Sequence, residues 1–251
     1  MGTLISKIVF QPPNDNGYEG FQKINTADGA HVCFLRTTPP KVYVEPRKSS
    51  VVYFHGNGEN LILLRSLLHS VAKITGKEVF AMDYRGYNQK KATRTLPNEI
   101  QFKSDVEAFV DGLQLKGDDV IVWGRSLGSS AAIRAAAFLQ RKNGGISTLI
   151  LQSGFYSAGT TKFPCLPRAV DIFKNYIDME DIDPKRVETV LIVHGEDDAV
   201  VPVSHATKMF KRFKDRGFNV HIKYFPYRNH NNIPASDVWD FYETVKSTSS
   251  E

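Results

Sequence analysis

Short apolar runs alternate along this chain with longer segments in which apolar residues recur every three or four positions. Each run has the length of a β-strand, and most runs are apolar throughout, which is typical of parallel strands covered by helices on both faces. The predicted strands are Val51–His55, Glu78–Met82, Val120–Trp123, Thr148–Gln152, Val190–His194 and Asn219–Phe225. The predicted helices are Leu61–Ile74, Asn98–Leu115, Leu127–Arg141, Ser204–Lys214 and Ala235–Val245. This alternation predicts an α/β fold with a mostly parallel central sheet and helices on both faces.

Two regions depart from the alternation. Runs with high strand propensity at Lys7–Phe10, Phe21–Asn25 and His31–Leu35 are separated by Gly and Asp, and they predict an N-terminal antiparallel hairpin at the sheet edge. The proline-containing segment Ser157–Val187 predicts a small lid inserted between two strands. With 251 residues, 41% of them hydrophobic and 24% charged, residues 1–251 are expected to form a single globular domain.

Composition excludes several classes of function. The net charge is +5, but Lys and Arg are spread along the chain without a nucleic-acid-binding motif, so no nucleic-acid partner is predicted. The cysteines, Cys33 and Cys165, are too few and too far apart for a disulfide framework or a cysteine zinc site, and neither a metal nor an organic cofactor is predicted. No apolar run reaches the ~18 residues of a spanning helix and no signal-peptide core is visible, which predicts a cytoplasmic protein.

The motif Gly-Arg-Ser-Leu-Gly at residues 124–128 lies where the strand Val120–Trp123 turns directly into a helix. So sharp a turn holds Ser126 in a sparsely populated backbone conformation, and the glycines two positions before and after it leave room for the turn. The turn raises the Ser126 hydroxyl above the carboxyl edge of the sheet. Ser126 is the predicted nucleophile, and the alternative is a chance match to the motif.

A serine nucleophile needs a general base, and the base needs an orienting acid. His230 lies in a polar loop directly after the last predicted strand, on the same edge as Ser126, and is the predicted base. Asp198 follows the strand Val190–His194 at the spacing His-Gly-x-x-Asp and is the predicted acid, with its neighbour Asp197 as the alternative.

The other histidines after the acid have simpler interpretations. His205 falls inside a helical pattern and His221 inside a strand, so structural roles are expected for both. The loop after the strand Val51–His55 reads His-Gly-Asn-Gly, and the backbone N–H groups of Asn57 and Leu127 are the predicted oxyanion hole. His55 itself is expected to brace this loop.

With these residues the chain resembles serine hydrolases of the α/β-hydrolase fold. The matching stretches are VVYFHGNGEN, FAMDYRGYN, VWGRSLGS, VLIVHGEDDAVVP and NHNN, in the order of that family. It is similar to the α/β-hydrolase domain-containing group that includes the protein depalmitoylases, the domain-containing protein 17 branch. The resemblance implies hydrolysis of acyl thioesters or esters through an acyl-enzyme, most of all S-acyl cysteines of proteins. Monoacylglycerol or small carboxylic esters are the alternative substrates, and a non-catalytic binding module is the alternative of another class.

Three departures from that branch leave the substrate open. Its N-terminal cysteine cluster is absent, Asn88–Lys91 and Arg94 stand where a small glycine-rich loop is usual, and Tyr227–Asn232 replaces Gly-x-Gly-His-Asn-Asp. The first residues fit instead the N-myristoylation pattern M-G-x-x-x-[ST] at Gly2, although an unmodified Met-Gly start is an equal alternative.

One myristoyl chain binds membranes only marginally, so a second signal is needed. Lys7 together with Lys90, Lys91 and Arg94 is the predicted basic contribution. The expected partners are therefore an acylated protein or a lipid ester, met at the cytosolic face of a membrane through N-myristoyl Gly2.

Overall fold

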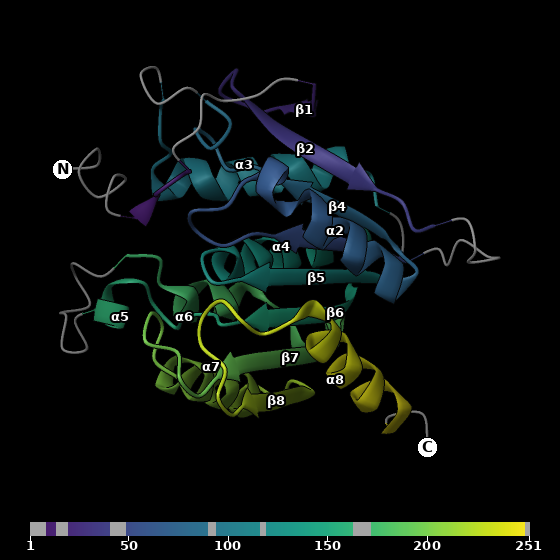
Figure 1. The fold of residues 1–251 in the computed structure, drawn as a ribbon, viewed down its shortest axis with the longest axis vertical. Coiled ribbons are helices and arrows are strands. Elements are labelled where there is room, and N and C mark those ends of the chain that lie inside the picture. Colours follow the sequence, from purple (N-terminus) through teal and green to yellow (C-terminus); the bar gives the residue numbers. More distant parts are fainter. Residues whose placement is uncertain are drawn as a thin grey trace.

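The structure is a computed structural model, and it describes residues 9–13, 20–40, 49–89, 94–115, 119–162 and 172–248. Its strands form an eight-stranded sheet in the order β1-β2-β4-β3-β5-β6-β7-β8 (Figure 1). The strands are β1 Gln22–Asn25, β2 His31–Thr37, β3 Ser50–Phe54, β4 Glu78–Met82, β5 Val120–Arg125, β6 Ile146–Gln152, β7 Val187–Gly195 and β8 Val220–Phe225. β3 to β8 pair in parallel, whereas β2 pairs antiparallel with both β1 and β4. The predicted mixed sheet and N-terminal hairpin are confirmed.

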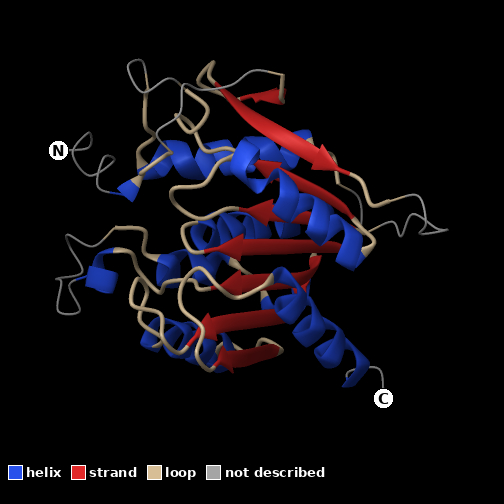
Figure 2. Ribbon diagram, in the orientation of Figure 1, coloured by secondary structure: helices blue, strands red, loops and turns tan. Residues whose placement is uncertain are grey.

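Helices cover both faces of the sheet, as the apolar runs predicted (Figure 2). α2 Leu61–Thr75 and α8 Ala235–Thr248 pack on one face, and α3 Glu99–Gly112, α4 Gly128–Asn143 and α7 Ser204–Asp215 pack on the other. The predicted helices are all present; they begin within one residue of the predicted position, and their C-terminal ends are shifted by one to three residues. Within the described ranges, no helix is long and apolar enough to cross a bilayer.

The first predicted strand is wrong where it can be examined. Lys7 lies outside the described residues, Val9 is helical, and Phe10 belongs to no strand. Phe10 is buried instead among aromatic side chains, its ring centroid 5.5 Å from that of Phe102 and 5.6 Å from that of Phe173. The apolar run therefore anchors the N-terminal segment in the core rather than adding an edge strand.

The predicted lid, Ser157–Val187, is described only in part, since residues 163–171, including Cys165, lie outside the described ranges. The rest forms short elements: α5 Gly159–Lys162, α6 Asn175–Asp178, η2 Met179–Asp181 and η3 Pro184–Arg186. Asn175 fastens this segment to α4, because its side-chain Oδ1 accepts from Ser130 Oγ at 2.6 Å and its Nδ2 donates to the Phe155 carbonyl at 2.8 Å. That it acts as a lid remains a prediction.

Arg85 ties the N-terminal hairpin to the body of the fold. It donates to both carboxylate oxygens of Asp28, at 2.7 and 3.0 Å, and to both oxygens of Asp105 on α3, at 2.6 and 3.0 Å. Asp105 is almost fully buried, and this burial raises its pKa against the opposing effect of Arg85. A buried carboxylate left without its cation is strongly destabilising.

Arg85→Met is therefore expected to lower the free energy of unfolding by about 3–5 kcal/mol near neutral pH. Without Arg85, the folded pKa of Asp105 would rise further above its unfolded value. The stability of the variant should therefore fall as pH rises through the unfolded carboxyl pKa, so its loss of stability relative to wild type should be smaller at pH ~4. Urea unfolding at the two pH values measures it. Arg85→Met combined with Asp105→Leu should recover much of the loss; no recovery, with the same loss at both pH values, would contradict this account.

Candidate active site

Ser126 occupies the strand-to-helix turn that the motif predicts, with φ of 52°, in the left-handed region that side chains rarely adopt. The flanking glycines are required by close backbone contacts. A Cβ at Gly124 would lie 2.2 Å from the Gly128 carbonyl oxygen, and one at Gly128 would lie 2.1 Å from the Phe54 carbonyl oxygen. The turn can form only because both positions lack side chains.

Ser126, His230 and Asp198 form a continuous hydrogen-bonded chain. His230 Nε2 lies 2.8 Å from Ser126 Oγ, and His230 Nδ1 lies 2.7 Å from Asp198 Oδ2. Since a carboxylate can only accept, Nδ1 carries the proton of the neutral ring and Nε2 accepts from the Ser126 hydroxyl. This arrangement can move the hydroxyl proton to His230 when Ser126 attacks a carbonyl carbon.

Asp198 is held ionised in a buried position. Its Oδ1 accepts from the backbone N–H groups of Val200 at 2.9 Å and Val201 at 2.8 Å. Burial raises the pKa of Asp198, but hydrogen bonds from His194, His230 and Val201 outweigh it and hold the pKa well below its usual range. The alternative acid, Asp197, is exposed, and among the described residues His230 Nδ1 pairs with Asp198 and not with Asp197.

His194, whose role was not predicted from the sequence, contacts the same oxygen of Asp198 that binds His230. Its ring is buried, with Nε2 donating to the Val201 carbonyl at 2.8 Å and lying 3.2 Å from Asp198 Oδ2. The only signal for it in the sequence is the first position of His-Gly-x-x-Asp, a pattern that predicts the acid by its spacing alone.

The two predicted oxyanion amides lie beside the serine. The Leu127 N–H follows Ser126 directly, and a Cβ built on Gly56 would lie 3.5 Å from Ser126 Cβ, so the loop that carries Asn57 packs against the nucleophile turn. Among the described residues, neither the Asn57 nor the Leu127 N–H donates a hydrogen bond to the protein. Free donors at this place are suited to binding a developing oxyanion.

The Asn57 side chain has a second role that its motif did not reveal. Its Nδ2 donates to the Val9 carbonyl at 2.6 Å, and its Oδ1 accepts from the Gln11 N–H at 2.8 Å and from the Tyr87 hydroxyl at 2.5 Å. One amide thus binds both backbone groups flanking the buried Phe10. The loop that carries Asn57 is thereby fixed to the N-terminal segment.

Three histidines have the structural roles expected of them. His55 braces its loop: Nδ1 donates to the Gly56 carbonyl at 2.8 Å, and Nε2 lies 3.3 Å from Asp83 Oδ1. His205 is buried and its Nδ1 accepts from the Tyr156 N–H at 3.0 Å. His221 pairs with Asn219 at 2.9 Å.

Most of the residues predicted to bind a membrane have no described structure. Gly2, Lys7, Lys90 and Lys91 lie outside the described residues. Arg94 is described, and its guanidinium donates to the carbonyls of residues 13 and 89 at 2.8 and 3.1 Å. In the described part of the chain, no group of His, Cys, Asp and Glu is arranged to hold a metal ion.

Comparison with protein families gives a match to the family described as serine aminopeptidase, S33, over residues 45–177, more than half of the 251-residue chain. The chain belongs to this S33 hydrolase family. Human alpha/beta hydrolase domain-containing protein 17B is 27% identical over 185 residues, which cover 71% of this chain and 58% of that relative. The predicted resemblance is confirmed, although the chain spans less than two thirds of the length of that relative.

Other proteins resemble this chain over more of their length. A putative alpha/beta hydrolase of Acanthamoeba polyphaga mimivirus is 26% identical over 244 residues, covering 91% of this chain and 87% of the relative. An esterase of Pyrococcus furiosus superposes with a TM-score of 0.66 at 17% identity over 95% of each chain. A soluble variant of Saccharomyces cerevisiae monoglyceride lipase gives 0.63 at 17% identity over 94% of this chain and 97% of that one. The likeness to both structures shows the predicted α/β-hydrolase fold.

Asp198→Asn is expected to lower kcat by roughly 10³–10⁴-fold, because an amide neither fixes the His230 tautomer nor stabilises the imidazolium. Asp197→Asn, the matched control one residue away, should leave kcat close to the wild-type value, because its side chain is exposed. Hydrolysis of a soluble ester by the two folded variants is the measurement. The opposite ranking would move the acid to Asp197.

Proposed function

We propose that this S33 hydrolase cleaves acyl esters or thioesters with Ser126 as nucleophile, His230 as general base and Asp198 as orienting acid. The observation that carries the proposal is the hydrogen-bonded chain from Ser126 Oγ through His230 to a buried carboxylate. Ser126 attacks the acyl carbonyl and passes its proton to His230, which returns it to the leaving thiol or alcohol. Water, activated by His230, then releases the acid from the acyl-enzyme.

The oxyanion of each tetrahedral intermediate is proposed to rest on the N–H groups of Asn57 and Leu127. Both donors belong to backbone held by packing and hydrogen bonds, so they need little rearrangement as charge develops. Their freedom from partners in the described residues supports this role.

Fatty acyl groups on protein cysteines are the proposed substrates. The similarity to the domain-containing protein 17 branch supports this class, and the intact Ser–His–Asp chain argues against a non-catalytic binding module. Carboxylic esters of small alcohols or of glycerol are the second candidate, since an esterase and a monoglyceride lipase share the fold.

Ser126→Ala is expected to lower turnover by several orders of magnitude and to abolish labelling by a fluorophosphonate probe, because the members of a triad act as a unit. The Ser126 side chain is only partly buried, so the variant should unfold at nearly the same temperature as wild type. Matched palmitoyl thioester and ester substrates then choose between the two substrate classes. Equal labelling of Ser126→Ala and wild type would remove Ser126 as the nucleophile.

A membrane-side location is proposed through N-myristoylation of Gly2. Gly2→Ala should shift the protein from the membrane to the soluble fraction, because the acyl chain that supplies the already marginal membrane binding is lost. Hydrolysis of a soluble ester should not change, because Gly2 is not one of the proposed active-site residues. Labelling of cells with an alkyne myristate analogue measures the modification directly. An unlabelled wild-type protein would contradict the location and leave the chemistry untouched.

A further inference from the structure

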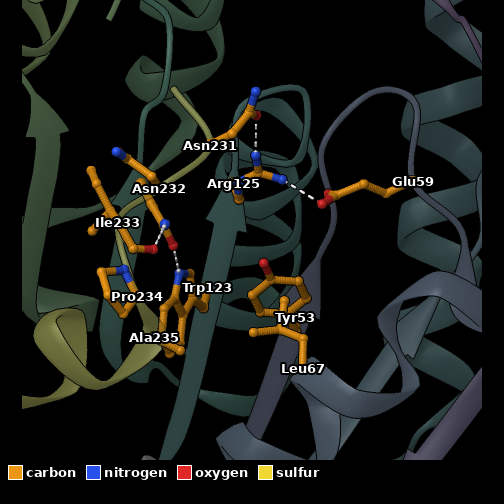
Figure 3. Close-up of a pocket in the computed structure, with 11 residues that line it drawn as sticks. Tyr53, Glu59, Leu67, Trp123, Arg125, Asn231, Asn232, Ile233, Pro234 and Ala235 are labelled. Carbon is orange, nitrogen blue, oxygen red and sulfur yellow. Dashed lines mark hydrogen bonds and ion pairs between the residues drawn. The ribbon is translucent and has the colours of Figure 1, made fainter. Parts of the chain in front are cut away.

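Arg125, the residue directly before Ser126, joins two loops of the proposed active site. Figure 3 shows its guanidinium lying between Glu59 and Asn231, which come from opposite sides of the sheet edge. Its side chain is only 12% exposed. The variable position of a G-x-S-x-G motif is thus occupied here by a mostly buried cation with defined partners.

One arm of Arg125 fixes the oxyanion loop. Nη1 donates to Glu59 Oε1 at 2.5 Å, and the other oxygen of Glu59 accepts from the Gly56 N–H at 2.7 Å. Gly56 immediately precedes Asn57, whose amide is proposed to bind the oxyanion. Through one carboxylate, Arg125 therefore sets where that amide lies relative to Ser126.

The other arm fixes the loop that carries the base. Nη2 donates to Asn231 Oδ1 at 2.6 Å and lies 3.4 Å from the His230 carbonyl oxygen. Because the backbone of Arg125 is continuous with Ser126, one residue spans nucleophile, oxyanion loop and base loop. A planar guanidinium can hold two acceptors at fixed angles, which an ammonium cannot.

The geometry points to Arg125 as a positioning residue that holds the Asn57 amide and His230 in register with Ser126. The inference rests on the proposed function and adds a specific device to it. Catalysis depends on placement within a fraction of an ångström, and a displacement of 1 Å caused away from the chemistry can cost about 10²-fold in rate. The Arg125 guanidinium binds Glu59, Asn231 and the His230 carbonyl rather than the Ser126 hydroxyl or the His230 ring, so its effect passes through the two loops.

A cavity of about 430 Å³ borders the guanidinium of Arg125. This space allows an experiment that distinguishes a positioning role of Arg125 from a role in packing. The guanidinium and both of its polar partners, Glu59 and Asn231, border this space, and the rest of its lining includes Tyr53, Leu67, Trp123 and the segment 232–235 (Figure 3). Removing the side chain would enlarge this space and leave Glu59 and Asn231 as acceptors at its margin. A small guanidinium ion could then take the place of the lost group.

Arg125→Ala is expected to lower kcat by about 10²-fold with KM nearly unchanged. Guanidinium chloride, well below the molar concentrations that unfold proteins, should restore part of kcat, whereas sodium chloride of equal ionic strength should not. Arg125→Lys should be intermediate and insensitive to guanidinium. The matched control is Arg36→Ala, which removes an exposed arginine paired with Glu78 on β4 and should change neither kcat nor its response to guanidinium.

A loss of kcat that guanidinium does not restore, in a folded Arg125→Ala protein, would overturn the positioning role. So would a kcat near wild type. If Ser126→Ala is inactive at the same time, the proposed function survives that failure; if Ser126→Ala is active, the function itself fails. Should Arg125→Ala not fold, Glu59→Gln leaves one acceptor oxygen for two donors, Asn231→Leu removes the acceptor of the other arm, and both should lower kcat at constant KM. Unchanged kcat in both would again contradict the inference.

Discussion

The close approach of α4 to the end of β3 is the constraint on which the site depends. The first residue of α4, Gly128, lies so near β3 that a Cβ would sit 2.1 Å from the Phe54 carbonyl oxygen. This contact forces the chain from strand to helix within two residues and holds Ser126 at positive φ. It also brings the loop after β3 against the nucleophile turn. One steric requirement thus places both the Ser126 hydroxyl and the backbone amides that are proposed to stabilise the oxyanion formed by its attack.

Charge in this region is held by hydrogen bonds against the cost of burial. Burial alone would favour a neutral Asp198, yet four donors converge on its two oxygens: two backbone N–H groups and the rings of His194 and His230. Hydrogen bonds to an ionised acceptor are about twice as strong as neutral ones, so their combined effect prevails. The carboxylate is therefore an anion already oriented toward His230, with no water shell to rearrange.

Patterns of local residues predicted the fold and the three residues of the hydrogen-bonded chain. Both ends of strand β4 were predicted to the residue, because polar turn residues on each side of its apolar run mark where the strand begins and ends. The supporting contacts could not be found in this way. Asn57 binds Gln11 across 46 positions, and Arg125 binds Asn231 across 106, and such pairings depend on the finished topology. Lys7–Phe10 failed for the same reason, since only the tertiary fold supplies the aromatic pocket that takes Phe10.

The loop that carries Asp198 and the loop that carries His230 explain each other's sequence. Gly195, the second residue of His-Gly-x-x-Asp, has no room for a side chain, because a Cβ would lie 2.2 Å from the Arg228 carbonyl oxygen. That same carbonyl accepts from the Asp197 N–H at 3.0 Å, which locks the two loops together. Within the base loop, Asn232 and Asn229 side chains accept from backbone N–H groups at 2.6 and 2.9 Å. The asparagine-rich sequence that departs from the related branch therefore supplies its own bracing around His230.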